Sequence, residues 1–206
     1  MSRVKIEGNA SGTGTFTIAA PNSSTDRTLT LPDEAGTVLT SASDIAASQL
    51  PAGSVIQVVS TTKTDTFSTT SSSFIDITGL SASITPTSAS SKILVRFDLT
   101  YGTNGSRMTF WRISRDSTPI GIGDANGSNV QSTSSHYTGG TDGDHNQASV
   151  TGEYLDSPNT TSQITYKIQQ QNQDAVVIYI NRWASSDNNS ITPRNASTIT
   201  VMEIAG

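Results

Sequence analysis

The sequence predicts an all-β protein: an antiparallel β-sandwich head of jelly-roll type behind a short-stranded N-terminal segment. Serine and threonine make up roughly three residues in ten, far above ordinary usage. Threonine favours strands because its branched Cβ packs on a pleated surface, and serine favours turns because its hydroxyl binds the local backbone. Short runs that alternate apolar and polar residues recur with no helical window between them. A β-barrel is the alternative architecture.

Residues 1–40 contain alternating runs of three or four residues, separated by glycine, proline and asparagine turns. Such small strands cannot bury a core within one chain, so they need copies of themselves or a larger protein. We therefore expect this segment to attach to a docking protein or to build a short shaft, and to become ordered only in a homotrimer or on its docking partner. The candidate docking and trimer residues are Phe16, Ile18, Leu29, Leu31, Val38 and Leu39.

Residues 41–52 differ in character and are expected to form a hinge or collar. Asp44 is placed to cap one short helical turn that runs to Ser48, and Pro51 would end it.

Residues 53–206 carry longer strand patterns and are expected to fold as the sandwich head. The expected strands are 54–60, 64–68, 74–77, 80–84, 92–101, 107–115, 118–123, 129–136, 148–156, 163–170, 176–181 and 197–204. The strongest core strand is 92–101, in which Val95, Phe97 and Leu99 share one face. In the strand around Trp111, alternation sends one of Phe110 and Trp111 into the core and the other toward a neighbouring subunit.

Composition excludes several classes of function. The chain has no cysteine, so disulfides, thiol catalysis and cysteine-based zinc sites are excluded. The net charge of −5 argues against nucleic acid as a partner, because phosphate binding needs clustered lysine and arginine. The start of the sequence lacks the apolar region of a signal peptide, and no run is long enough to insert into a membrane.

Two long loops, residues 124–147 and 183–195, are rich in glycine, serine, asparagine and aspartate. Loops on a rigid β scaffold are where binding residues concentrate, and exposed aromatic rings stack on sugars and anchor interfaces. The alternative for Trp183 is that it closes the end of the sandwich. The candidate receptor-binding residues are Tyr137, His136, Asp142, Asp144, His145, Trp183 and Asn188.

Neither a metal site nor an active site is expected. His136 and His145 flank two aspartates, but their spacing fits no known ligand motif. Residues 124–128 look like half of a calcium loop whose distal glutamate is missing, so an Asn-Gly turn is the better interpretation. No Gly-x-Ser-x-Gly motif is present, and serine is too common for its proximity to a histidine to mean anything. We expect no cofactor and no enzymatic activity.

Segments spread along most of the chain carry a resemblance to a known family. Residues 12–40, with Arg27-Thr28-Leu29-Thr30-Leu31-Pro32-Asp33 followed by Gly36-Thr37-Val38-Leu39, resemble a module found in tail-fibre proteins of tailed phages, especially cyanobacterial and marine ones. Residues 53–95 look like the opening of a C-terminal domain common in the same proteins. Segments similar to the rest of that domain lie at 115–120, 155–158, 179–182 and 197–203.

The resemblance implies a virion component, usually trimeric, with no defined catalytic residue. We expect a short trimeric phage tail fibre, assembled in the host cytoplasm, that binds other tail or baseplate proteins and a host-surface glycan or protein. The alternatives are a capsid decoration or head fibre, or a baseplate connector, without receptor binding. A free carbohydrate-binding module and a depolymerase are further hypotheses.

Overall fold

The computed structural model describes residues 11–15, 17, 22, 24–26, 28, 30, 45–139, 146–185, 188 and 190–206. The chain divides into two compact units, Met1–Ala42 and Ser43–Gly206. The described residues of the first unit are exposed, and none of them lies in a helix or strand. The predicted docking and trimer residues, Phe16, Ile18, Leu29, Leu31, Val38 and Leu39, lie outside the described residues, so their role stays a prediction.

A single helical turn precedes the strands of the second unit. The 3₁₀-helix η1 (Ala47–Gln49) confirms the turn expected within residues 41–52. The Gln49 side chain accepts a hydrogen bond from the backbone N–H of Ala46 at 2.9 Å and so caps the turn, whereas Asp44, the expected cap, lies outside the described residues. Within the described part of the chain, no helix is long and apolar enough to cross a membrane.

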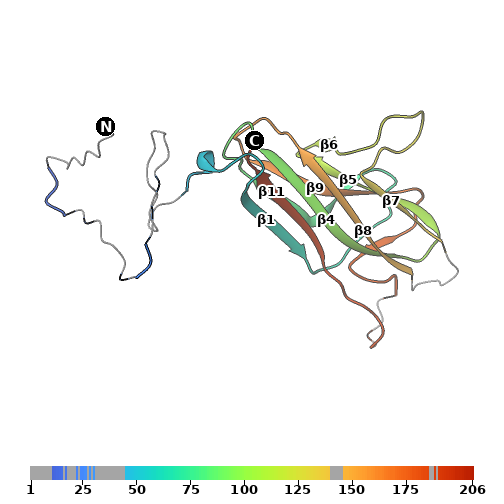
Figure 1. The fold of residues 1–206 in the computed structure, drawn as a ribbon. Coiled ribbons are helices and arrows are strands. Elements are labelled where there is room, and N and C mark those ends of the chain that lie inside the picture. Colours follow the sequence, from blue (N-terminus) through green and yellow to red (C-terminus); the bar gives the residue numbers. More distant parts are fainter. Residues whose placement is uncertain are drawn as a thin grey trace. The chain divides into compact units, whose positions relative to one another are not determined.

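Two antiparallel sheets confirm the all-β sandwich, and Figure 1 shows β1, β11, β4 and β8 of the first sheet side by side. The first sheet contains β1 (Val55–Lys63), β11 (Ser197–Ile204), β4 (Lys92–Thr103), β8 (Asn146–Asp156), β10 (Ile178–Ile180) and β2 (Phe67–Thr69). The second sheet contains β3 (Ile75–Ile84), β9 (Ile164–Asn172), β5 (Arg107–Arg115), β6 (Thr118–Ile120) and β7 (Ser134–Thr138). The two separate sheets exclude a closed barrel, while a jelly-roll connectivity and a homotrimer stay predictions.

Three of the predicted strands need correction. Residues 74–77 and 80–84 were expected to be separate strands, but they form one strand, β3, whose pairing with β9 shifts register between Asp76 and Ser81. Gly79, with a φ of +84°, takes the left-handed conformation that this irregularity requires. The predicted strand 129–136 is displaced to Ser134–Thr138, because the residues before it form a loop.

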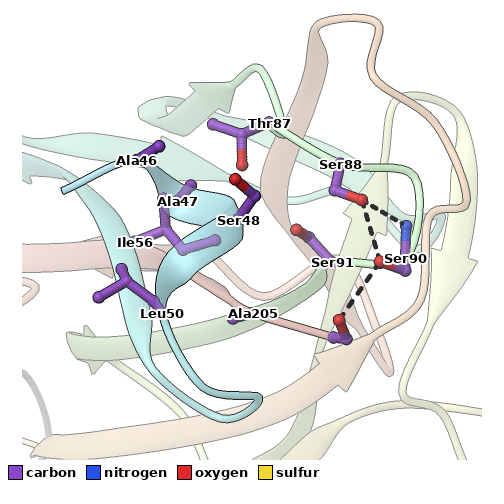
Figure 2. A pocket seen from close by; sticks show the side chains of 11 residues that line it. Ala46, Ala47, Ser48, Leu50, Ile56, Thr87, Ser88, Ser90, Ser91 and Ala205 are labelled. Atoms are coloured by element: carbon purple, nitrogen blue, oxygen red, sulfur yellow. Dashed lines mark hydrogen bonds between the residues drawn. The ribbon is translucent and has the colours of Figure 1, made fainter. Parts of the chain in front are cut away.

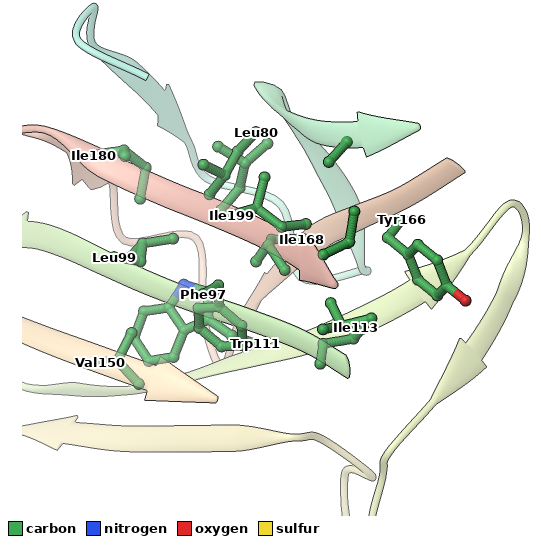
Figure 3. Packing of buried hydrophobic residues seen from close by; sticks show 14 of the residues in the cluster. Leu80, Phe97, Leu99, Trp111, Ile113, Val150, Tyr166, Ile168, Ile180 and Ile199 are labelled. Atoms are coloured by element: carbon green, nitrogen blue, oxygen red, sulfur yellow. The ribbon is translucent and has the colours of Figure 1, made fainter. Parts of the chain in front are cut away.

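The core lies between the two sheets and is formed by alternate residues of their strands. Val95, Phe97 and Leu99 are fully buried, which confirms that they share the core face. Trp111 is also fully buried, so Phe110 is the neighbour that faces outward. Figure 3 shows side chains from both sheets meeting in this layer, and each large side chain contributes about 1.5–3 kcal/mol when it is buried.

A buried carboxylate connects the two sheets. Asp156, at the end of β8, accepts a hydrogen bond from Arg115 Nη1 at 2.9 Å and one from the Tyr166 hydroxyl at 2.7 Å. Arg115 and Tyr166 are cross-strand partners on β5 and β9 of the opposite sheet. Burial and the bond to Asp156 raise the pKa of the Tyr166 hydroxyl well above its usual range. The Asp156 side chain is 6% exposed, so this contact is an internal connection.

The register of the strands gives the sandwich two distinct ends. The first residues of β1 and β4 and the last residues of β11 and β8 lie at one end, where the chain enters from residues 45–54; we call this the proximal end. The last residues of β1 and β4 and the first residues of β11 and β8 lie at the other, distal end. At the rise of an antiparallel strand, β4 alone separates the ends by about 37 Å.

Candidate functional site: a groove on the second sheet

The predicted receptor-binding residues fall into two described groups. Tyr137 and His136 lie on β7, and Trp183 and Asn188 lie in the loop that follows β10. Asp142, Asp144 and His145 lie outside the described residues, so their predicted role is not examined by the structure. Where described, both loops leave from the distal part of the sandwich, because β7 ends and β8 begins there.

His136 points toward the interior, whereas Tyr137 points outward. The ring nitrogen Nδ1 of His136 hydrogen bonds to the hydroxyl of Tyr101, which lies on β4 of the other sheet. The same hydroxyl contacts Thr138 Oγ1 at 3.2 Å, and the Tyr101 ring packs 4.6 Å from the Trp111 ring. His136 therefore links the two sheets while remaining exposed, and Tyr137, 57% exposed, is the member of this pair whose side chain faces away from the core.

Trp183 is half-buried, and its backbone lies against β4. A Cβ atom at Gly102 would lie 3.0 Å from the Trp183 Cα and would overlap the Arg182 carbonyl, so only glycine permits this close approach. Arg182 stacks over the Tyr179 ring at 4.0 Å and donates hydrogen bonds to the carbonyls of Trp183 and Ala184 at 2.9 Å. The start of this loop is thus fixed to the sandwich, while Asn188 is exposed beyond it.

A groove of about 500 Å³ lies on the outer face of the second sheet, toward the distal end. We call it the β5–β9 groove. Its floor is formed by outward-facing residues of β5 and by residues at the end of β9, and the loop before β7 supplies its wall. Its lining residues are Met108, Phe110, Ser128, Asn129, Val130, Gln171 and Gln173. Tyr137 borders the groove, because it is the cross-strand partner of Met108.

Local hydrogen bonds hold the wall of the groove. The backbone N–H of Asn129 donates to the Asn126 carbonyl at 3.1 Å, and Gly127 has a φ of +57°, which agrees with the expected Asn-Gly turn. The Gln131 side chain donates to the Gly123 carbonyl at 2.7 Å across the loop. The wall is therefore a structured turn rather than an open strand edge.

A polar ladder continues from the groove along the same face. Arg112 donates to the Gln169 side-chain oxygen at 2.8 Å, and Gln169 in turn donates to Asp76 at 2.7 Å. The guanidinium of Arg112 also lies 3.9 Å above the Phe74 ring, and partial burial lowers its pKa. Because these side chains already contact each other, the surface beside the β5–β9 groove is fixed before any ligand binds.

The chemistry of the β5–β9 groove is that of a neutral polar ligand site. Its side-chain amides can each donate and accept hydrogen bonds, and Phe110 and the bordering Tyr137 offer apolar faces. None of the described residues that line it is charged. Among the described residues, no cluster of histidine, aspartate and glutamate could hold a metal ion. A sugar fits this combination, because its hydroxyl groups can hydrogen bond to the amides and the apolar face of its ring can stack on the aromatic side chains.

A second cavity of about 530 Å³ lies at the proximal end, between η1, the loop after β3 and the end of β11. Figure 2 shows that two of its serine hydroxyls bond to each other: Ser88 Oγ lies 2.9 Å from Ser90 Oγ, and Ser90 donates to the Gly206 carbonyl at 3.4 Å. Its walls otherwise carry alanine, leucine and isoleucine. With no aromatic ring among its described lining residues, this cavity is the poorer candidate for a sugar.

The residues that line the β5–β9 groove were not among the candidate site residues predicted from the sequence. Alternation along 107–115 does place Phe110 on the face opposite Trp111, but the predicted strand 163–170 ends one residue before Gln171. Their approach to Asn129 depends on a loop that no pattern in the sequence specifies.

Comparisons with known proteins give no family. No protein-family model matches the chain, and no curated protein is detectably similar. Among solved structures, the tripod (BppUct-A-L) from the baseplate of bacteriophage Tuc2009 is 14% identical, with a TM-score of 0.34 over 92% of this chain and 84% of that one. The VP2 subviral particle of infectious bursal disease virus is 12% identical, with a TM-score of 0.31 over 72% of this chain and 38% of that one. Scores this low do not establish a shared fold, so neither similarity assigns a function.

Proposed function

We propose that the chain is a non-enzymatic structural protein of a phage virion: a short trimeric tail fibre whose head binds a glycan on the host surface. Residues 1–40 attach the protein to the tail or baseplate, or build a short shaft, and the β5–β9 groove is the glycan site. The protein is assembled in the host cytoplasm and acts in the virion. The resemblance of residues 12–40 and 53–95 to tail-fibre modules supports the virion role.

The observation that carries the proposal is the position of the groove relative to the entering chain. The chain enters at the proximal end, and the groove lies toward the distal end, where β5 begins and β9 ends. An attachment protein needs its docking segment and its receptor site apart, so that both can be occupied at once. Weak binding by each groove would add up to firm attachment through several copies.

The test is a binding titration against immobilised bacterial surface polysaccharides and their constituent neutral sugars. Replacing Phe110 or Gln171 by alanine is expected to weaken binding per chain by about 1–2 kcal/mol, a roughly 5- to 30-fold rise in Kd. Ser83→Ala, an exposed position on β3 of the same sheet, is the matched control and should bind like the wild type.

Two results would contradict the proposal. Absence of binding to every polysaccharide, together with labelled copies located on the capsid or inside the baseplate by imaging, would favour the decoration or connector alternative. Release of soluble sugars from a polysaccharide during the incubation would instead indicate a depolymerase.

A further inference from the structure

The outer face of the first sheet carries an apolar row at its proximal end. One residue from each of four adjacent strands contributes: Val58 pairs with Met202, Met202 with Leu94, and Leu94 with Leu155. Val58 is 55% exposed and Leu155 46% exposed, although both are aliphatic. We call these four residues the apolar row.

Toward the distal end, the next row of the same face is polar. This row holds Ser60, Thr200, Arg96 and Glu153 in register, and the hydroxyls of Ser60 and Thr200 lie 2.9 Å apart. A solvent-facing sheet normally alternates core residues with polar ones, as this face does beyond the apolar row. A contiguous exposed apolar strip with a polar rim is typical of a protein–protein interface.

We propose that the apolar row and the Arg96–Glu153 row are the surface through which copies of this chain associate in the head. The inference rests on the proposed function in one respect: copies whose leading segments share a shaft must approach one another where that segment enters, and the apolar row lies at that end.

The charges of the face fit a second copy better than a different partner. Arg96 and Glu153 are cross-strand neighbours, and both are exposed. The row next to the apolar row therefore presents one cation and one anion side by side. Around a three-fold axis, each copy can place its Glu153 against Arg96 of the next copy, so the surface is complementary to itself. A strongly acidic or basic partner would leave one of the two charges unpaired.

The absence of cysteine from the sequence makes a direct test possible in the full chain. Leu155→Cys introduces one thiol in the apolar row, and Ile191→Cys introduces one at an aliphatic residue that is 68% exposed in the loop after β10. In the assembled protein, the thiol at position 155 should react with a soluble disulfide reagent at least about tenfold more slowly than the thiol at position 191. In urea the two rates should become equal.

Light scattering supplies the second readout. The wild-type chain at about 20 µM should have the mass of three chains, and Leu155→Glu, but not Ile191→Glu, should lower the assembled fraction about tenfold. A monomeric wild type, or equal thiol rates at the two positions, overturns the inference. The glycan titration separates the two proposals. Slow thiol reaction at position 155 without glycan binding supports the interface and contradicts the glycan site. Glycan binding with equal thiol rates supports the glycan site and contradicts the interface.

Discussion

Replacing Asp156 by asparagine should remove much of the connection between the two sheets. Arg115 donates to both Asp156 oxygens, at 3.0 and 2.9 Å, and Tyr166 donates at 2.7 Å. A hydrogen bond to a charged group contributes about 1.5–3 kcal/mol, and breaking a buried ion pair costs about 3–5 kcal/mol. Arg115 is 27% exposed and regains some hydration, and asparagine keeps one acceptor oxygen. We therefore expect a loss of about 2–4 kcal/mol in the free energy of unfolding.

Urea unfolding at pH 7 measures this loss, with fluorescence of the fully buried Trp111 as the signal. Asp124→Asn, an exposed loop position, is the control and should stay within about 0.5 kcal/mol of the wild type. In a double-mutant cycle, Tyr166→Phe should lose less in the Asp156→Asn background than alone, because the two share a bond. A cost below about 0.5 kcal/mol for Asp156→Asn, or strict additivity in the cycle, would refute the reasoning.

Two further predictions follow from buried groups. Burial alone would raise the pKa of Glu203, but hydrogen bonds from Gln57 and Thr87 outweigh it and hold the pKa below the usual 4.5. The resulting stabilisation is complete above pH 4.5 and is lost as the pH falls through the lower pKa of the folded state. The melting temperatures of the wild type and Glu203→Gln should therefore converge as the pH is lowered from 7 to 3. A constant difference between the two melting temperatures would contradict this. Gly152→Ala places a Cβ 2.7 Å from Cζ of the buried Phe97 and should lower the free energy of unfolding, measured in urea, by about 1–3 kcal/mol. Gly123→Ala, whose Cβ would have no atom within 4 Å, is the control and should leave the stability unchanged. Equal effects of the two substitutions would exclude the clash.

The sequence predicted best where alternation is regular and turns are explicit. The bounds 107–115 and 197–204 match β5 and β11, because apolar residues recur at every second position and Asp116-Ser117 marks the hairpin. β3 was read as two strands, since Thr78-Gly79 has turn chemistry and nothing local shows that the strand resumes.

The features that could not be predicted from the sequence are contacts between residues far apart in the chain. The burial of Asp156 depends on Arg115 and Tyr166 from the opposite sheet, and no local pattern carries that information. The same limit applies to the β5–β9 groove. Tyr137 was recognised as an exposed aromatic residue, but the floor at Gln171 and the wall at Asn129 meet only through the tertiary fold.

The first and last strands of the head are neighbours: β1 pairs with β11, and β11 pairs with β4. Because β11 lies between two other strands, the sheet cannot close until β11 itself has been synthesised. This arrangement gives the head a high contact order, which slows folding. The first sheet can therefore be completed only late in the synthesis of the head, and deletion of β11 would leave β1 and β4 as two unpaired strand edges prone to aggregation.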